Sequence, residues 1–381
     1  MSPSMIPEVE EENKKYQKGV KHLCDNGLTK VPTKYILPEP DRPIFRKSDK
    51  IKPKENLKLP VIDFAELLGP NRPRVLQTLA NACETYGFFQ VVNHGIEGDI
   101  SKNMIDVCKR FFELPYVERS KYMSSDMSAP VRYGTSFNQN KDNVFCWRDF
   151  LKLFSHPLPD YLPHWPSSPS DFRGLAATYA KETRHLFHMI VRAILESLDR
   201  TDAGFAAGES PENLCGGGDE AVEELEEGSQ LVVVNCYPPC PEPELTLGMP
   251  PHSDYGFLTL LLQDDVEGLQ ILSGDDWLTV DPIPGSFVVN VGDHLEIFSN
   301  GRYKSVLHRV LVNSCKPRIS VASLHSFPTN STVKPWPKIV DDRSNPPRYL
   351  GTDFTTFLRY ISSCEPKWKN FLESRKIHHK F

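Results

Sequence analysis

Two histidines and one carboxylate stand in a pattern that can bind a metal ion. His252 and Asp254 are two residues apart, and His308 follows much later in the chain. Two histidines and one carboxylate are the ligand set that leaves open positions on non-haem Fe(II). Side chains two residues apart in an extended strand point the same way, so His252 and Asp254 are expected to project together. His308 must then arrive from a different strand.

A second group of polar residues could bind a carboxylate. Arg318 and Ser320 are also two residues apart, in a run that otherwise looks buried, and so share one face. A buried arginine is costly unless it meets an anion, and a guanidinium beside a hydroxyl is a good carboxylate receptor. Asn235 and Tyr237 offer two more polar groups at the same spacing. The alternative interpretation places Arg318 in a structural ion pair with an Asp or Glu.

The elements that must position these residues are mostly short strands. Apolar runs separated by Gly, Pro, Asp or Asn predict strands over residues 231–237, 258–263, 268–272, 277–280, 286–291, 307–313 and 319–327. This pattern is typical of a sandwich or barrel, and the jelly roll, an architecture of eight strands, fits it best. Helical spacing predicts helices over residues 73–86, 100–114, 172–199 and 352–375, the last with a break at Pro366.

The chain divides by composition into five segments. We expect an N-terminal arm at 1–56, a mixed helical region at 57–200, a flexible Gly- and Glu-rich loop at 201–228, a jelly-roll core at 229–330 and a C-terminal helical segment at 331–381. Residues 124–170 are irregular and rich in aromatic side chains, as in binding walls or lids, although edge strands and packed loops explain them as well.

The bulk composition excludes several classes of protein. The 381 residues carry a net charge of −6, which gives no sign of a nucleic-acid or anionic-membrane binder. Nine cysteines include no CxxC pair, which argues against a structural zinc site and favours reduced thiols. There is no signal-peptide pattern and no run long enough to span a membrane. We therefore expect a cytoplasmic, monomeric protein that binds a small molecule, with no nucleic-acid or membrane partner.

Many ordered segments from Leu59 onward resemble one family. They are Leu59-Pro-Val-Ile-Asp, Gly87-Phe-Phe-Gln-Val-Val-Asn-His-Gly, Asn235-Cys-Tyr-Pro-Pro-Cys-Pro, Pro251-His-Ser-Asp, Leu258-Thr-Leu-Leu-Leu-Gln-Asp, Asn290-Val-Gly-Asp, Ser299-Asn-Gly-Arg-Tyr-Lys-Ser-Val-Leu-His-Arg-Val and Pro317-Arg-Ile-Ser. The chain resembles the plant soluble 2-oxoglutarate- and Fe(II)-dependent dioxygenases of specialised and hormone metabolism. That family includes flavonoid oxidases, gibberellin oxidases and coumarin-forming hydroxylases.

The resemblance implies a fold, cofactors and site residues. The fold is mainly β with helices: a double-stranded β-helix (jelly-roll) core with a helical N-terminal region packed on it. By position, His252, Asp254 and His308 match the iron ligands, which would also be the catalytic centre. The residues that match the 2-oxoglutarate site are Arg318 and Ser320 of the family's Arg-x-Ser, Tyr237, and Asn235 as a polar residue near the cosubstrate. Fe(II), 2-oxoglutarate as cosubstrate, O2 and ascorbate as reductant are the implied cofactors.

The substrate is less defined by the sequence. Candidate pocket walls are Tyr133, Phe137, Phe150, Leu324, Ser326, Phe354 and Leu358. Their apolar, aromatic character suits a small, largely apolar metabolite such as a phenolic, flavonoid, terpenoid or hormone. Leu324 stands where flavonoid-oxidising relatives tend to carry an aromatic residue, which argues against a flavonoid. The resemblance implies hydroxylation or desaturation with release of succinate and CO2, and O-demethylation by the same iron site also stays open.

Two alternatives from other classes stay open at this point. One is a catalytically silent protein that binds or senses a small molecule on the same fold. The other is a zinc hydrolase with the same three metal ligands, although Arg318 and Ser320 would then lack a partner.

Overall fold

Two β-sheets and a layer of helices make up the protein. The computed structural model describes residues 18–43, 57–136, 142–199, 219–341, 343–363 and 371–377, without the side chains of residues 219 and 361–363. An eight-stranded sheet has the order β1-β2-β10-β7-β12-β5-β4-β3, and a four-stranded sheet has the order β6-β11-β8-β9. The strands are β1 (Val61–Asp63), β2 (Phe88–Val92), β3 (Val131–Thr135), β4 (Asp149–Phe154), β5 (Ser229–Tyr237), β6 (Met249–His252), β7 (Leu258–Gln263), β8 (Leu269–Ser273), β9 (Asp276–Thr279), β10 (Phe287–Val291), β11 (His308–Val310) and β12 (Arg318–Ser326).

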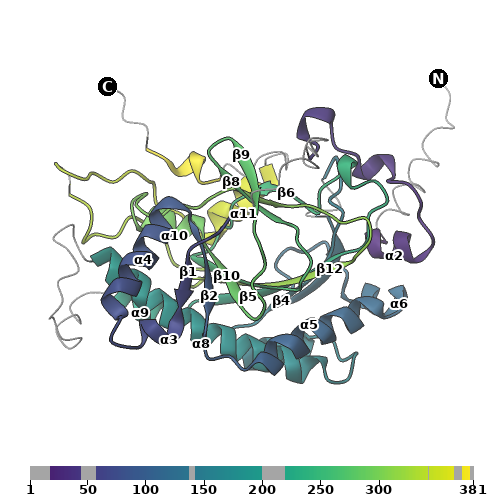
Figure 1. The fold of residues 1–381 in the computed structure, drawn as a ribbon, viewed down its shortest axis with the longest axis horizontal. Helices are drawn as coiled ribbons and strands as arrows, with labels where there is room; N and C mark the ends of the chain where they lie inside the picture. Colours follow the sequence, from purple (N-terminus) through teal and green to yellow (C-terminus); the bar gives the residue numbers. More distant parts are fainter. Residues whose placement is uncertain are drawn as a thin grey trace.

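The helices lie mainly on one face of the large sheet. They are α2 (Val20–Asp25), α3 (Phe64–Leu67), α4 (Arg72–Thr85), α5 (Gly98–Glu113), α6 (Tyr116–Arg119), α7 (Leu158–Tyr161), α8 (Phe172–Asp199), α9 (Asp219–Glu226), α10 (Asp293–Phe298) and α11 (Phe354–Ser363). Figure 1 shows α5 and α8 side by side beneath the large sheet, with β6, β8 and β9 of the small sheet above it. The predicted mainly β fold with a jelly-roll core is confirmed.

Strand alternation decides which side chains meet these helices. Leu151 and Leu153 of β4 are fully buried in one apolar core with Leu186 and Ile190 of α8. Each such side chain contributes about 1.5–3 kcal/mol when it is buried. The residues that alternate with these leucines along β4 point to the opposite face of the sheet, toward the four-stranded sheet. The helices therefore hold the large sheet in place and leave its other face for a site.

The N-terminal segment 18–43 packs against the edge of this assembly. The backbone N–H of Val20 donates to Asp149 Oδ1 at 2.9 Å, and the Tyr35 ring meets Trp147 edge-on with 5.4 Å between ring centroids. Both Val20 and Tyr35 are fully buried. The rest of the predicted arm, residues 1–17 and 44–56, lies outside the described residues.

Several local predictions need correction. The predicted loop 201–228 ends in a helix, α9, because Ala221 and Leu225 are four residues apart and both enter the core beside α8. Residues 201–218 of that loop are not among those described. In the C-terminal segment the described residues form α11 (Phe354–Ser363) and a 3-10 turn (Glu373–Arg375), whereas residues 364–370, with the predicted break at Pro366, lie outside the described residues. Among the described residues, none of the helices has the length and apolar composition to cross a membrane.

His325 on β12 should make stability depend on pH. Its ring stacks on Phe187 of α8 at 4.3 Å between centroids, and its Nε2 lies 2.9 Å from Ser323 Oγ. Burial, and then the charges of Arg184 and His188, lower the pKa of His325 well below 6.5. Below pH 6.5 the His325 imidazole is therefore protonated in the unfolded chain but stays neutral in the native protein. The free energy of unfolding is retained above pH 6.5 and declines as the pH falls below it.

The expected result is a larger loss of stability on acidification in the wild type than in His325→Gln. Urea unfolding midpoints at about pH 7.5 and about pH 5.5 measure it, because the neutral glutamine cannot be charged but keeps a hydrogen-bonding group for Ser323. An equal loss in both proteins would contradict the prediction.

Candidate active site

The pairing of β6 with β11 brings the two histidines together. His252 and His308 are direct partners in this antiparallel pair, and their ring centroids are 4.1 Å apart. Asp254 is not on the strand, because β6 ends at His252. The expectation that one extended strand aims both residues was therefore wrong. Asp254 is placed by the turn after β6, where its carbonyl accepts a hydrogen bond from the backbone N–H of Asp293 at 2.7 Å.

The three side chains converge on one point. Asp254 Oδ1 is 3.8 Å from Nε2 of His252 and 3.8 Å from Nε2 of His308, and the three ligand atoms all lie within 4.8 Å of one another. Nδ1 of His252 is 2.9 Å from the Pro250 carbonyl, and Nδ1 of His308 is 3.3 Å from the Val306 carbonyl. Nδ1–H donation to these carbonyls makes each Nε2 the unprotonated nitrogen, which is the form that binds a metal ion.

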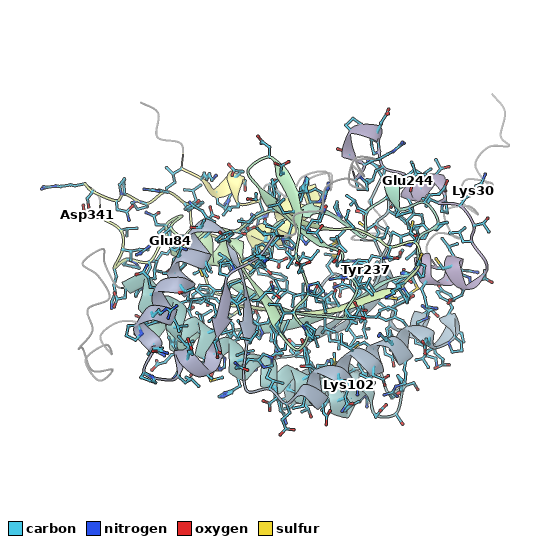
Figure 2. All side chains as sticks on the ribbon, in the orientation of Figure 1. Lys30, Glu84, Lys102, Tyr237, Glu244 and Asp341 are labelled. Carbon is cyan, nitrogen blue, oxygen red and sulfur yellow. The ribbon has the colours of Figure 1, made fainter. Side chains whose placement is uncertain are left out.

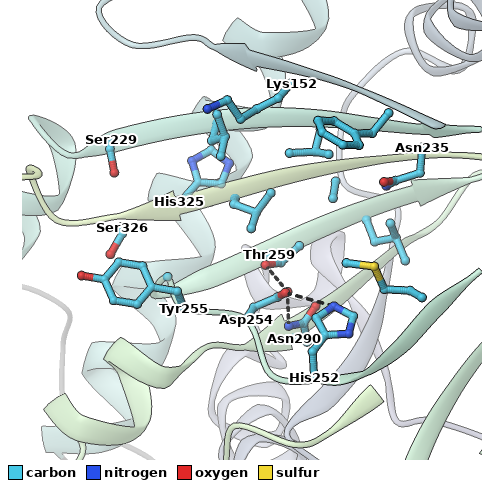
Figure 3. A pocket seen from close by; sticks show the side chains of 18 of the residues that line it. Lys152, Ser229, Asn235, His252, Asp254, Tyr255, Thr259, Asn290, His325 and Ser326 are labelled. Carbon is cyan, nitrogen blue, oxygen red and sulfur yellow. Dashed lines mark hydrogen bonds and ion pairs between the residues drawn. The ribbon is translucent and has the colours of Figure 1, made fainter. Parts of the chain in front are cut away.

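The second oxygen of Asp254 is held by two neighbours. Thr259 Oγ1 donates to Oδ2 at 2.6 Å and Asn290 Nδ2 donates at 2.9 Å, so Oδ1 is left to face the imidazoles (Figure 3). Burial by itself raises the pKa of Asp254, but the charges of His308 and His252 and the two hydrogen bonds outweigh it and lower the pKa to about 2. The carboxylate is therefore anionic at neutral pH.

Loss of one of these donors should weaken metal binding. Thr259→Val removes the hydroxyl at nearly constant volume, so Oδ2 loses its shortest hydrogen bond and Asp254 is less well oriented. Outer-shell changes of this kind typically cost about 10–100-fold in metal affinity. Anaerobic Fe(II) titration measures the effect, with Thr78→Val on the exposed face of α4 as the matched control. Equal affinity in both variants would show that Thr259 does not orient the ligand.

The pairing of β5 with β12 assembles the predicted cosubstrate residues. Arg318 lies opposite Tyr237 and Ser320 lies opposite Asn235 across these two strands. Asn235 Nδ2 is 3.5 Å from Ser320 Oγ, and the Arg318 guanidinium carbon is 5.3 Å from the centre of the Tyr237 ring. Figure 2 shows Tyr237 in the interior, whereas Lys102 of α5 lies at the surface. All four residues line the same cavity as the metal-binding triad.

Arg318 is a buried cation with an unused donor. It is 2% exposed; its Nε donates to the Val266 carbonyl at 3.0 Å and its Nη2 donates to Gln263 Oε1 at 2.8 Å. Its Nη1 has no hydrogen-bond partner, and no described Asp or Glu forms an ion pair with it. The structural ion pair considered for Arg318 is therefore not found in the described part of the chain. A carboxylate ligand would satisfy both the charge and the free N–H.

Comparison with known proteins agrees with this geometry. Residues 228–326 match the 2OG-Fe(II) oxygenase superfamily model, and residues 59–168 match the model of the non-haem dioxygenase in morphine synthesis N-terminal region. The chain is 42% identical over 316 residues to flavanone 3-dioxygenase 2 of Oryza sativa subsp. japonica, covering 82% of this chain and 85% of that protein. The chain belongs to the 2-oxoglutarate- and Fe(II)-dependent dioxygenases. The predicted family and enzyme class are confirmed.

Two further similarities support this family membership. The dioxygenase is 39% identical over 315 residues to protein DMR6-LIKE OXYGENASE 1 of Arabidopsis thaliana, covering 83% of this chain and 84% of the relative. Its fold matches the crystal structure of JOX2 in complex with 2OG, Fe and JA, with a TM-score of 0.79 and 31% identity over 94% of this chain and 98% of that one. The dioxygenase is thus an oxidoreductase of a family that uses Fe(II), 2-oxoglutarate and O2.

The cavity of the dioxygenase lies between its two sheets and has a volume of about 290 Å³. Five of the predicted substrate residues line it: Phe150, Leu324, Ser326, Phe354 and Leu358. Phe150 and Leu324 come from the large sheet, and Phe354 and Leu358 come from α11. Phe137 lies outside the described residues.

Tyr133 is not a wall of this cavity, which corrects the prediction. The ring lies on the helix-facing side of β3, in the core with Phe111 and Phe112. Its hydroxyl donates to Asp149 Oδ2 at 3.0 Å and accepts from Arg119 Nη1 at 3.2 Å. Because neighbouring residues of a strand face opposite ways, Arg132 rather than Tyr133 reaches the cavity.

Several polar residues of the dioxygenase site were not predicted from the sequence. Asn290 stands in the Asn-Val-Gly-Asp segment and was visible as a motif, but its contact with Asp254 needed the β10–β7 pairing. Three cations, Arg132, Arg148 and Lys152, also line the cavity. The spacing of Phe150 and Lys152 by two could have identified the lysine as a neighbour on the same face.

Proposed function

We propose that this dioxygenase hydroxylates or desaturates a small plant metabolite of the phenolic, flavonoid, terpenoid or hormone classes, with release of succinate and CO2. The observation that carries the proposal is the buried, unpartnered Nη1 of Arg318 in the same cavity as the His252–Asp254–His308 cluster. A metal site and a carboxylate receptor in one cavity are what a 2-oxoglutarate-dependent oxidation needs. The relatives extend the range of substrates to consider, since one is named a flavanone dioxygenase and another is solved with JA.

Each residue group has one task in this proposal. When bound, Fe(II) and 2-oxoglutarate supply the oxidising chemistry with O2. Nε2 of His252, Nε2 of His308 and Oδ1 of Asp254 bind the metal ion. Arg318 binds the distal carboxylate of 2-oxoglutarate, together with Ser320, Tyr237 and Asn235, which lie beside it on β12 and β5. The apolar walls exclude water and aim one C–H bond of the substrate at the metal.

The remaining parts of the proposal rest on the family resemblance and the composition. Ascorbate serves as the reductant that keeps iron in the Fe(II) state. The protein acts as a cytoplasmic monomer without a nucleic-acid or membrane partner, in keeping with its net charge of −6.

Succinate formation is the direct test. The protein is incubated with 2-oxoglutarate, Fe(II), ascorbate and O2 against a panel of plant phenolics, flavonoids, terpenoids and hormones. We expect one compound class to raise the rate of succinate formation above the rate without organic substrate. Mass spectrometry of the product then distinguishes hydroxylation, a gain of about 16 Da, from desaturation, a loss of about 2 Da. Binding of 2-oxoglutarate without succinate from any compound would favour the silent binding protein.

Metal content separates the oxygenase from a zinc hydrolase. Protein purified without oxygen is expected to hold exchangeable Fe(II) weakly, because the cluster offers one carboxylate and two imidazoles rather than thiolates. Tightly held stoichiometric zinc, with hydrolytic activity, would favour the hydrolase.

A further inference from the structure

The cavity has a second cationic region, away from Arg318. Arg132 of β3 and Lys152 of β4 are direct partners in the antiparallel pair, and both line the cavity. Arg132 is 4% exposed and Lys152 is half-buried. Like charges placed directly opposite each other on one face of a sheet are destabilising, so this arrangement needs a compensating partner.

Among the described residues, the hydrogen-bond partners of both cations are neutral. Arg132 donates through Nε to the Ser124 carbonyl at 2.9 Å and lies 3.4 Å from Met127 Sδ through Nη1. Lys152 Nζ donates to the Met127 carbonyl. Neither residue forms an ion pair with a described Asp or Glu.

Two acidic residues, Asp126 and Asp142, act on the pair electrostatically and form no ion pair with it in the described part of the chain. Asp126 is fully exposed and Asp142 accepts a hydrogen bond from Ser136 Oγ at 2.6 Å. Desolvation, and then the charge of Arg132, lower the pKa of Lys152 to about 8, an effect that the distant charge of Asp126 opposes but does not cancel. The two positive charges of Arg132 and Lys152 are therefore only partly offset by these carboxylates.

Strand register separates this pair from the proposed 2-oxoglutarate site. Lys152 lies opposite Val233 of β5, whereas Arg318 lies opposite Tyr237 of the same strand. Four residues of strand correspond to about 13 Å. One small carboxylate cannot span that distance, so a group bound by Lys152 is not the carboxylate bound by Arg318.

A row of apolar side chains continues from Lys152 across the large sheet. Val233 of β5, Ala322 of β12 and Leu261 of β7 continue the row that starts with Arg132 and Lys152, and all line the cavity. Figure 3 shows Lys152 on the opposite side of the cavity from His252 and Asp254. A molecule with one end at Lys152 and the other at the metal site would thus cross an apolar surface.

We propose that Arg132 and Lys152 bind an anionic group of the organic substrate, which is therefore an apolar carboxylic acid. The carboxylate pairs with the two cations, the apolar body lies on Val233, Ala322 and Leu261, and the far end reaches the metal site. This inference rests on the proposed function and narrows its substrate class. It also adds one anionic group to the small, largely apolar metabolite expected from the sequence.

Matched acid and ester pairs test the proposal. Affinities of cinnamic, indole-3-acetic and decanoic acids and of their methyl esters are measured by calorimetry on the full chain, loaded anaerobically with Fe(II) and 2-oxoglutarate. We expect at least one acid to bind about tenfold or more tightly than its ester, since charge-assisted hydrogen bonds have that strength when buried. In Lys152→Met this preference should fall below about threefold, and Lys152→Arg should restore most of it.

Controls separate this inference from the proposed function. Lys102→Met, on the exposed face of α5, should leave every affinity unchanged. 2-Oxoglutarate affinity should be unchanged in Lys152→Met, which excludes a role of Lys152 in cosubstrate binding. If no acid binds more tightly than its ester, or Lys152→Met weakens acid and ester equally, the pair only anchors residues 124–127 and the inference is overturned. Failure of 2-oxoglutarate itself to bind to the wild type would instead overturn the proposed function.

Discussion

Alanine in place of His252, Asp254 or His308 is expected to abolish succinate formation and leave the fold in place. Each substitution removes one of three ligand atoms that lie within 4.8 Å of one another, and the remaining two cannot hold a metal ion in a defined geometry. The loss should exceed the roughly 10–100-fold cost of an outer-shell change. The loss should appear in anaerobic Fe(II) affinity as well as in turnover, because the residues act by binding the metal.

The fold is checked by circular dichroism and thermal unfolding of each variant. His164→Ala, at an exposed histidine outside the site, is the matched control and should retain full activity. Turnover that persists in all three ligand variants would refute the assignment of the metal site.

Arg318→Leu is expected to remove 2-oxoglutarate binding. Nη1 of this 2% exposed guanidinium has no hydrogen-bond partner among the described residues, so we expect it to bind the distal carboxylate of the cosubstrate. Truncating one partner of a buried, hydrogen-bonded charge pair costs about 2–5 kcal/mol, which corresponds to roughly 30-fold to several thousandfold in affinity. Calorimetry with 2-oxoglutarate on the anaerobic metal-loaded protein measures this.

Stability gives a second readout for Arg318→Leu. In the wild type, 2-oxoglutarate should raise the melting temperature, because a ligand that binds only the native state stabilises it. This rise should disappear in Arg318→Leu and persist in Arg74→Leu, a substitution at an exposed arginine of α4. Unchanged 2-oxoglutarate affinity in Arg318→Leu would show that Arg318 has a structural role and does not bind the cosubstrate.

Local periodicity predicted much of the site because strands alternate with a period of two. The spacing of Arg318 and Ser320, and of Asn235 and Tyr237, placed each pair on one face, and β12 and β5 pair so that these faces coincide. The helix over 172–199 was predicted with its observed bounds because its apolar stripe is long and regular.

The same periodicity could not say which face of a strand looks into the cavity. On β3, Tyr133 and Arg132 alternate, and the aromatic residue was the natural choice for a binding wall. The structure buries Tyr133 against α5 and turns Arg132 to the cavity, because the apolar core beneath the sheet takes the larger apolar area. The position of Asp254, beyond the end of β6, likewise depends on a turn held by Asp293.

The sequence by itself determined the chemical types available: two imidazoles and a carboxylate for a metal ion, and a guanidinium in a buried run for an anion. Only the tertiary structure decided which of them meet. His252 and His308 become neighbours by strand pairing, and Arg132 and Lys152 become a pair of neighbouring cations in the same way. Strand neighbours far apart in sequence are chosen by burial and hydrogen bonding of the whole sheet, which no local pattern contains.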